Sequence, residues 1–492
     1  MQEINSIFKT SLLDFVPARG IDVECVVIGS GAGGALTAHF LAKKGKEVLI
    51  IEEGPFVEFE DGKCGIADTF PRVWREGGAI PIMSNISLVF GEGRCLGGST
   101  QLNAGLLNRI PSEIIEHWRN EYRIRDLETE TMNKYQERIE QALSAHTAND
   151  AKNPMGRILR QGAERTRYKG VEVPVAAQEI SGRKIKQSMQ QTFLKDAALL
   201  GGVKFLVNCR VERINMAGAK ARGITALWRG KEGAQRITIN CKYIFVCAGT
   251  IQSPLLLRRS GVKKNVGSSV QFHPTLRVLA EFNEPVSGYA HEMSSFQIKE
   301  FAPLLTMGAS LTSPPYIAAC LALDWEQQKE FMEAQDRMAI FYVGVKSRAL
   351  GTARNIPFGR GSYIVRYSLL PEDAKNLGFG YAKLCELLFA AGAKRLFPAI
   401  TGAGIIENPA QVEQYLSAPL PLGALNLVTI HSYGSCPMGE RENGAALDSY
   451  GKLRGFDNIY VNDASMLPGS PGVNPQGPIM ALALRNMEHN FL

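Results

Sequence analysis

The 492-residue sequence lacks three features that would each define a class of protein. Its nine scattered cysteines include no Cys-x-x-Cys pair, its lysines and arginines form no dense block, and no apolar run approaches the length of a membrane span. The first absence argues against a disulfide framework or zinc site, the second against nucleic-acid binding and the third against a transmembrane segment. No histidine–carboxylate cluster has metal-ligand spacing either, so we expect no metal site and a reduced, cytoplasmic setting.

The N-terminus also lacks the apolar core of a secretory signal. Residues 1–20 are predicted to form a short N-terminal extension that includes the amphipathic stretch "IFKTSLLDFV". Peripheral membrane association through this stretch stays open as an alternative. The chain is too long for one simple core, and 45% hydrophobic residues with a net charge of +7 describe an ordinary globular protein of two domains or lobes.

The strongest motif that is present lies near the N-terminus, in "VVIGSGAGGALTAHFLAKKGKEVLIIEEG". Gly29, Gly31 and Gly34 have the G-x-G-x-x-G spacing between an apolar strand and a helix, which is typical of a dinucleotide-binding unit. The first glycine permits the tight turn, the second lets the backbone approach a pyrophosphate, and the third lets the helix pack on the strand. Glu52 ends the second strand, where a carboxylate can accept hydrogen bonds from ribose hydroxyls. This unit alone leaves FAD and NAD both open.

Two further segments carry small residues suited to a ligand's approach. "GGSTQLN" contains Gly98, Ser99 and Asn103, although a plain turn would read the same way. "CAGTIQSPLLLRRSG" predicts a buried strand, a small-residue turn at Ala248 and a helix that starts near Ser253–Pro254.

These segments, in this order, together with "IYVNDASMLPGSPGVNPQGPIMALA", resemble the glucose–methanol–choline (GMC) oxidoreductases. The details are nearest to the fatty-alcohol-oxidase and cholesterol-oxidase side of that family. The resemblance implies FAD and oxidation of an alcohol carbon. It implies that Gly29, Gly31 and Gly34 face the pyrophosphate and that Glu52 faces the adenine ribose. The other positions implied to contact FAD are Gly98, Ser99, Asn103, Val211, Ala248, Asp463, Ala464 and Pro475.

Two departures from the family pattern matter. Some members attach the flavin through a histidine just before the loop asparagine, but this chain has Leu102 there, so we expect non-covalent FAD. In "QFHP", Phe272 replaces the aspartate of the family's Asp-His-Pro turn, and we therefore expect a structural role for His273.

The candidate catalytic residues lie near the C-terminus. His431 heads "HSYGSCPMG", and Asn474 follows in "GVNPQGP"; in the resembling enzymes such a pair lies on either side of the substrate hydroxyl. A histidine can accept the hydroxyl proton, and a neutral amide can orient the oxygen. Asn474 and Pro475 also suit the N-cap and first position of a helix. The alternative is a turn histidine and a simple cap.

The predicted fold class is α/β, with a Rossmann-like FAD-binding domain and an inserted α+β substrate domain that contains an antiparallel sheet. The FAD-binding domain is assigned to residues 21–130, 185–284 and 425–492. The substrate-binding domain is assigned to residues 131–184 and 285–424.

The predicted function is FAD-dependent oxidation of an alcohol to an aldehyde or ketone. The substrate is expected to be a small-molecule alcohol, and the apolar content of the inserted domain favours a hydrophobic one. The electron acceptor is left open among oxygen, a quinone and a redox protein. A flavin-containing lyase, a photodecarboxylase and a nucleotide-binding regulator with a vestigial site remain alternatives.

Overall fold

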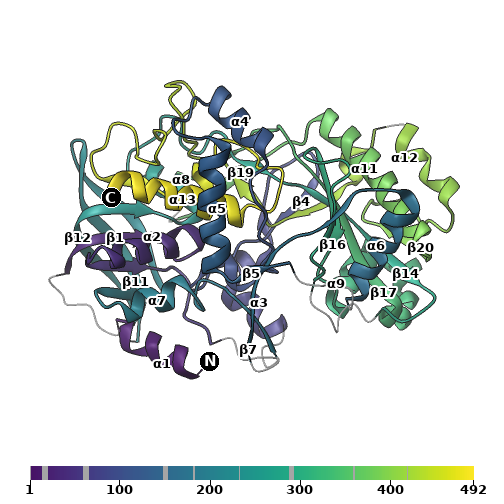
Figure 1. Ribbon diagram of the computed structural model, residues 1–492, viewed down its shortest axis with the longest axis horizontal. Coiled ribbons are helices and arrows are strands. Elements are labelled where there is room, and N and C mark those ends of the chain that lie inside the picture. Colours follow the sequence, from purple (N-terminus) through teal and green to yellow (C-terminus); the bar gives the residue numbers. More distant parts are fainter. Residues whose placement is uncertain are drawn as a thin grey trace.

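Two large β-sheets, one in each lobe, organise the chain (Figure 1). The computed structural model describes residues 2–13, 20–58, 66–147, 153–180, 183–231, 233–286, 293–357, 361–417 and 419–492. The sequence prediction of an α/β fold with a Rossmann-like unit and an antiparallel sheet is confirmed.

The first sheet has the strand order β10–β11–β12–β1–β2–β9, with β23 beside β12. Its strands are β1 (Ile21–Ile28), β2 (Val48–Ile51), β9 (Val203–Leu206), β10 (Cys209–Ala217), β11 (Lys220–Gly230), β12 (Gly233–Val246) and β23 (Ile459–Val461). Strands β9, β2, β1, β12 and β23 run parallel, whereas β10, β11 and β12 form antiparallel hairpins. The parallel strands are short apolar runs because both of their faces are covered.

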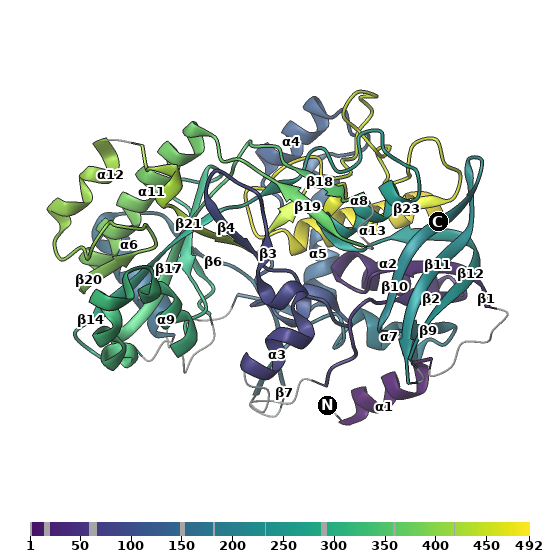
Figure 2. The same cartoon turned by 180° about the vertical axis from the view of Figure 1, so that it is seen from behind.

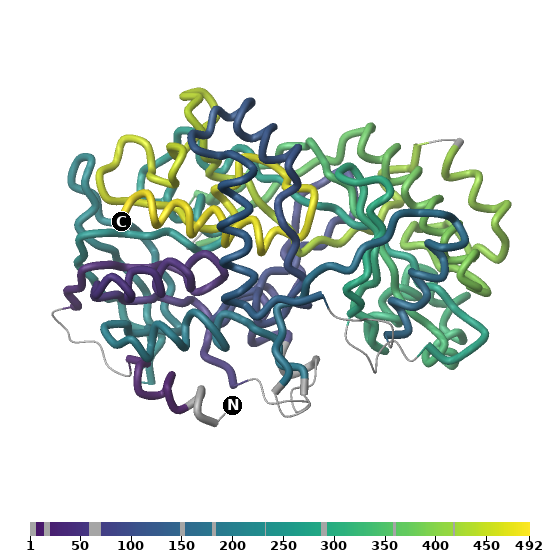
Figure 3. Tube along the Cα trace, in the orientation of Figure 1, coloured from purple at the N-terminus to yellow at the C-terminus, as the bar shows by residue number. Residues whose placement is uncertain are grey.

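Segments from the two ends of the chain lie side by side on this sheet, where the purple α2 lies next to the yellow α13 in Figures 1 and 3. The helices of this lobe are α2 (Ala32–Lys43), α5 (Thr129–Ala142), α7 (Phe193–Leu199), α8 (Gly249–Arg259) and α13 (Gln476–Phe491). Helix α13 packs against α2 and α5, and Asn462 Nδ2 donates to Thr37 Oγ1 (2.8 Å). The lobe is therefore completed only when the C-terminal segment returns to it.

The carboxyl ends of four parallel strands meet at one edge of the first sheet. Ile28 is in register with Ile51 and Val246, and Val246 is in register with Val461. The residues that follow these strands therefore gather at one place, which is where open α/β sheets bind ligands.

The second sheet has nine strands and is mostly antiparallel (Figure 2). Its order is β3–β4–β21–β14–β17–β16–β15–β6, with β20 also paired to β14. Its strands are β3 (Ile80–Pro81), β4 (Ser87–Phe90), β6 (Gly170–Glu172), β14 (Thr275–Phe282), β15 (Phe296–Ile298), β16 (Leu305–Ala309), β17 (Met338–Val345), β20 (Ala393–Pro398) and β21 (Asn426–Thr429). Helices α6 (Pro154–Thr166) and α11 (Pro371–Ala390) pack against it in one apolar core, and α9 (Pro314–Leu321) packs in another.

The remaining described elements are short or peripheral. They are α1 (Gln2–Ser11), α3 (Ile66–Val73), α4 (Ser112–Glu121), α10 (Trp325–Gln328), α12 (Gln414–Ser417) and the small ladders β5 (Ala145–His146) with β7 (Val175–Ile180) and β8 (Arg183–Lys186), β13 (Gln271–Phe272) with β22 (Ser432–Tyr433), and β18 (Thr352–Asn355) with β19 (Tyr363–Arg366). In the described part of the chain, none of the helices has the length and hydropathy to cross a membrane, and no group of histidine, cysteine and acidic residues could hold a metal ion.

The predicted domain division stays a prediction, but the membership of four strands differs from it. Strands β3, β4, β14 and β21 fall in segments assigned to the FAD-binding domain, yet they belong to the second sheet. Their apolar pattern predicts a strand but does not say to which sheet it belongs. Sheet membership is decided by the partner strands, which are distant in the sequence.

The predicted N-terminal extension is also more integrated than expected. Its helix α1 contacts α7 and β9, and Phe8 is fully buried against the rings of Phe56 and Phe205. Leu13 N donates to Phe205 O (2.9 Å). Residues 14–19 of this segment lie outside the described residues. Cys64, which is not part of the segment, also lies outside them. The eight described cysteines are all free.

Candidate active site

A cavity of about 1660 Å³ lies between the carboxyl edge of the first sheet and the loop that carries His431. It is lined by nearly all of the predicted site residues, namely Gly29, Gly31, Glu52, Gly98, Ser99, Asn103, Val211, Ala248, His431, Asp463, Ala464, Asn474 and Pro475. Gly34 is the exception and does not line it. We call the part around Gly29–Gly33, Glu52, Gly98 and Asp463 the cofactor end, and the part around His431 and Asn474 the reaction end.

The glycines at the cofactor end serve different physical purposes. Gly29 has a φ of 98°, and an added Cβ would lie 2.3 Å from Cys247 O. Gly34 is needed for close packing, since its Cβ would lie 2.1 Å from Gly29 O; the expectation that it faces the pyrophosphate is therefore corrected. At Gly31, which caps α2, a Cβ would meet no atom within 4 Å. The N-terminus of α2 thus presents bare backbone N–H groups to the cavity.

Glu52 is buried and held by its neighbours in the turn. Its Oε2 accepts from Ser30 Oγ (2.6 Å) and Ser30 N (3.2 Å), and its Oε1 accepts from Gly54 N (2.8 Å). Burial raises the pKa of this carboxyl, and the hydrogen bonds from Ser30 and Gly54 oppose that shift. The carboxylate still has acceptor sites that can face a ligand.

Asp463 joins its own turn to α8 at the cofactor end. Its Oδ2 accepts from Gly249 N (2.8 Å) and Ser253 Oγ (2.5 Å), and its Oδ1 accepts from Ser465 N (2.8 Å) and Ser465 Oγ (2.5 Å). Ser253 was expected to cap α8, but the helix begins at Gly249 with Ala248 as its cap. Ser253 lies inside the helix and its Oγ accepts from Ala248 N (3.0 Å).

The small-residue loop closes over the glycine turn. A Cβ at Gly98 would lie 3.0 Å from Gly31 Cα, so the two backbones touch. Ser99 Oγ accepts from Gly93 N (2.9 Å), and Asn103 Nδ2 donates to Gln476 Oε1 (2.6 Å). Val211 borders the same cavity at a register shift in β10, which interrupts regular strand pairing there.

The reaction end brings His431 and Asn474 together. Asn474 Nδ2 lies 3.3 Å from His431 Nε2, and Asn474 Oδ1 accepts from Asn108 Nδ2 (3.0 Å) and Gln297 Nε2 (3.2 Å). Burial lowers the pKa of His431 to about 4, so the ring is neutral near pH 7. The predicted pair is therefore adjacent, and the ring of His431 carries no charge near pH 7.

Asn474 does not cap α13 as the sequence suggested. The cap position is Pro475, and α13 starts at Gln476. The amide of Asn474 is engaged by three side chains instead, because it points away from the helix and toward His431. The N-terminus of α13 still faces the cavity.

His431 lies between two short strands, each of which pairs with an antiparallel partner. Strand β14 pairs with β21, and β13 pairs with β22, so the chain around His273 runs beside the chain around His431. His273 N donates to His431 O (3.2 Å). The ring nitrogens Nδ1 of the two histidines lie 3.2 Å apart.

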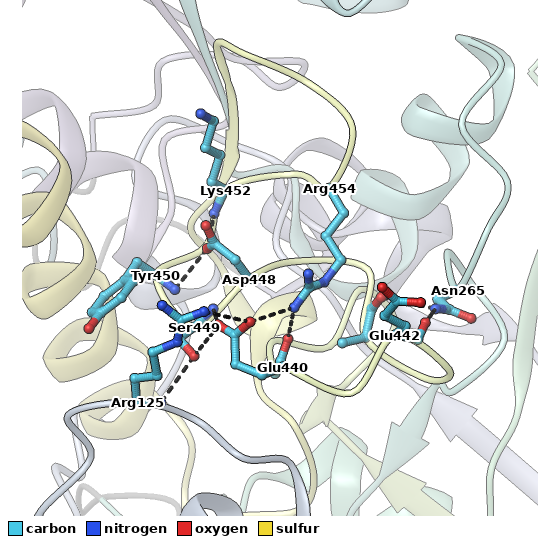
Figure 4. A network of polar contacts seen from close by, with 11 residues as sticks. Arg125, Asn265, Glu440, Glu442, Asp448, Ser449, Tyr450, Lys452 and Arg454 are labelled. Carbon is cyan, nitrogen blue, oxygen red and sulfur yellow. Dashed lines mark hydrogen bonds and ion pairs between the residues drawn. The ribbon is translucent and has the colours of Figure 1, made fainter.

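The chain that follows His431 is hydrogen-bonded to the backbone after Asp463, at the cofactor end. Gly434 N donates to Ala464 O (3.2 Å) and Cys436 N to Ser465 O (2.8 Å). Cys436 is fully buried, as expected for a packing residue. Further on, the loop is closed by Glu440, which accepts from Ser449 Oγ (2.6 Å) and pairs with Arg454 (3.1 Å), as Figure 4 shows.

Sequence profiles of the GMC oxidoreductase family match residues 70–275 and 355–483, and a Rossmann-like NAD(P)-binding profile matches residues 27–57. An uncharacterised GMC-type oxidoreductase of Sinorhizobium fredii is 34% identical over 481 residues, which span 95% of this chain and 94% of the relative. The chain belongs to the GMC oxidoreductase family.

Other relatives place the GMC fold over nearly the whole chain. A long-chain-alcohol oxidase of Arabidopsis thaliana is 24% identical and covers 94% of this chain and 67% of its own length. Among solved structures, pyridoxine 4-oxidase from Mesorbium loti superposes with a TM-score of 0.73 at 17% identity, covering 95% of this chain and 99% of that one. The protein is therefore an oxidoreductase, and its flavin cofactor is implied by the family and by the dinucleotide unit.

The residues of this GMC oxidoreductase fit a dinucleotide. Gly31 leaves open space where any larger residue would place a side chain, and the N-termini of α2 and α13 both border the cavity. An adjacent buried ion-pair cluster, in which Arg75 bonds Glu53 (3.1 Å) and Glu92 (2.9 Å), helps to line the cavity.

Several site residues were missed by the sequence analysis. Asn108 and Gln297 hold Asn474, His273 contacts His431 rather than serving only the local structure, and Trp74, Met293 and Ile430 line the cavity. No spacing in the sequence could reveal Asn108 or Gln297, because each comes from a different segment of the chain. The unusual "FHP" was the only available signal for His273.

Proposed function

We propose that the protein oxidises an alcohol CH–OH group to a carbonyl, with His431 as the base and Asn474 as the residue that orients the hydroxyl. The observation that carries this proposal is the neutral His431 beside Asn474 at the end of a cavity with a dinucleotide-type turn at its other end. The bound flavin would supply the acceptor for the hydride. The chain's own part is to place the alcohol and take its proton.

The proton and the oxygen have separate partners in this mechanism. His431 Nε2 accepts the hydroxyl proton as the C–H hydride leaves, so that both the proton and the electron pair are accounted for. Asn474 Nδ2 donates to the substrate oxygen and stabilises its partial negative charge without competing for the proton. The N-terminus of α13 contributes positive potential on the same side of the cavity.

FAD is proposed to bind non-covalently. Leu102 offers no nucleophilic side chain for a covalent link. Gly29, Gly31 and Gly98 would admit the pyrophosphate, and Glu52 and Val211 would face the adenosine. Ser99, Asn103, Ala248, Asp463, Ala464 and Pro475 would line the rest of the cofactor. Each of these residues lines the cavity, and its assigned contact rests on the resemblance to the family.

A hydrophobic alcohol suits the reaction end best. Trp74, Leu106, Met293 and Ile430 line the cavity, and Ile430, which precedes His431, is 55% exposed. Apolar walls favour an alkyl or ring substituent on the carbinol carbon. The electron acceptor and a cytoplasmic location stay predictions.

The test is anaerobic absorbance of the purified holoenzyme with a long-chain primary alcohol, an aryl alcohol, a sterol, choline and glucose. We expect one of the apolar alcohols to bleach the flavin, and His431→Ala to slow bleaching by roughly 10²–10⁴-fold. His117→Ala serves as the control, because His117 lies on α4 and does not line the cavity.

Three outcomes contradict the proposal. One is a colourless protein that takes up no FAD. Another is turnover of substrate without any reduction of the flavin, which indicates a lyase or a photodecarboxylase. A third is equal bleaching of the wild type and His431→Ala.

A further inference from the structure

The side chains at the reaction end are linked by a chain of hydrogen bonds in which the donor and the acceptor of each bond can be assigned. Asn474 Oδ1 accepts from both Asn108 Nδ2 and Gln297 Nε2, so its oxygen already has two donors. Its Nδ2 therefore turns to His431 Nε2, 3.3 Å away. A donor at this position requires an acceptor on the ring, which means that Nε2 of His431 carries a lone pair.

A neutral imidazole carries one proton, so the proton of His431 lies on Nδ1. Nδ1 faces Nδ1 of His273 at 3.2 Å, and one of these two atoms has to donate. Burial, together with the neighbouring His431 and Lys299, lowers the pKa of His273 to about 3, which keeps this ring neutral. His431 is then the donor and His273 the acceptor.

The ring of His273 is fixed by its surroundings. An added Cβ on Gly344 would lie 2.8 Å from His273 Nε2, so this ring rests directly on β17. The two imidazoles are stacked, with centroids 5.4 Å apart and planes inclined by 21°. Thr429 Oγ1 lies within hydrogen-bond distance of His273 O (3.0 Å) and His431 O (3.1 Å) and donates its one proton between them, next to both backbones.

We propose that His273 is a positioning residue that holds His431 in the Nδ1–H tautomer, so that the lone pair of Nε2 faces the space beside Asn474. The consequence for catalysis rests on the proposed function. There the substrate hydroxyl proton moves to Nε2, and the resulting imidazolium keeps its Nδ1–H bond to a neutral acceptor. Because that acceptor carries no charge, it orients the base without raising its pKa as a carboxylate would.

The first test is the tautomer itself, measured on holoenzyme with ¹⁵N-labelled histidine by long-range ¹H–¹⁵N correlation, without substrate. The resonances of His431 are assigned by their loss in His431→Gln. We expect Nδ1 to be protonated and Nε2 to be unprotonated. A His431 that carries its proton on Nε2 would overturn the inference, whatever the enzyme oxidises.

The second test compares two isosteric variants. In His273→Asn the side-chain oxygen lies near the former Nδ1 and can accept from His431, whereas His273→Leu has the same shape without an acceptor. We expect His273→Asn to keep the tautomer and to reduce its flavin within roughly threefold of the wild-type rate. His273→Leu should lose the tautomer and react roughly ten- to a hundredfold more slowly at unchanged alcohol affinity.

Equal impairment of the two variants, or an unchanged tautomer in His273→Leu, would show that His273 only fills space. His117→Asn is the matched control for replacing a histidine elsewhere, and it should change neither readout. If no alcohol reduces the flavin of the wild type, the proposed function fails, while the tautomer in the wild type and in both variants still decides the role of His273.

Discussion

The cofactor end of the cavity is made of backbone and glycine, whereas the reaction end is made of side chains from distant segments. At the cofactor end, Gly29 and Gly33 cannot accept a Cβ without a clash with backbone carbonyls. At the reaction end, Asn108, Asn474 and His431 meet through single hydrogen bonds. We therefore expect substitutions at the cofactor end to lower both the unfolding free energy and the flavin content. Substitutions at the reaction end should lower only the rate of the reaction.

The largest effect is expected for Asp463→Ala. The change removes the acceptor for Gly249 N and for the buried residues Ser253 and Ser465. It should cost about 3–5 kcal/mol of unfolding free energy together with the flavin. Urea unfolding and the visible absorbance of the purified protein measure the two losses.

Asp448→Ala is the control for Asp463→Ala. Asp448 accepts only from Tyr450 N (2.9 Å) and Lys452 N (3.0 Å) in the loop of Figure 4, so its loss should cost about 1 kcal/mol. Equal losses in the two variants would contradict the view that Asp463 ties the cofactor end together.

Two glycines of the same turn separate folding from binding. A Cβ at Gly33 would lie 1.8 Å from Asn462 O, so Gly33→Ala should destabilise the protein by about 2–3 kcal/mol. Gly31→Ala meets no atom and should leave stability unchanged while weakening flavin binding, because its methyl group enters the cavity. Thermal unfolding of the flavin-free protein and titration with FAD provide the comparison. If Gly31→Ala unfolded as readily as Gly33→Ala, the assigned division of roles would be wrong.

The pH dependence of stability should distinguish the two ends. His431 and His273 have pKa values lowered to about 4 and about 3, so the unfolded chain binds their protons first as the pH falls below about 6.5. Stability from this pair is complete above pH 6.5 and is lost between pH 6.5 and about 3. At the cofactor end burial raises the pKa of Asp463, and the stability this contributes is instead lost as the pH rises.

We therefore expect the unfolding free energy to drop by roughly 2–3 kcal/mol between pH 7 and pH 5.5, and by less in the double variant His273→Asn, His431→Gln. His146→Asn, at an exposed position, is the control and should follow the wild type. Denaturant unfolding at a series of pH values makes the measurement. An identical slope in the wild type and the double variant would exclude the pair as its source.

The smallest effect concerns the support of Asn474. Asn108→Leu removes one of the two donors to Asn474 Oδ1 and should slow reduction of the flavin by about tenfold, or about 1.4 kcal/mol, with flavin content unchanged. Stopped-flow absorbance gives the rate, and Asn133→Leu on α5 is a matched control. A loss of flavin in Asn108→Leu would show that the two ends are not independent.

The residues that the sequence assigned to one site line one cavity where the pattern is local. The glycine turn, Glu52 and the segment around Asp463 each follow a strand, and the parallel register then brings them to one edge. His431 and Asn474 were found because each heads a recognisable loop. The helix starts at Ser253 and Asn474 were misplaced, because in both cases the polar side chain has a tertiary partner that a capping pattern does not reveal.

The sequence by itself determined the dinucleotide unit, the family and the two residues proposed for catalysis, because these depend on strand–turn–helix patterns that are read over a few tens of residues. Only the tertiary structure decided which strands form the second sheet and how α1 docks. It also decided that Asn108, Gln297 and His273 surround the reacting pair. Those contacts join residues more than a hundred positions apart, and their existence depends on packing and on the hydrogen-bond needs of buried groups, which no local pattern encodes.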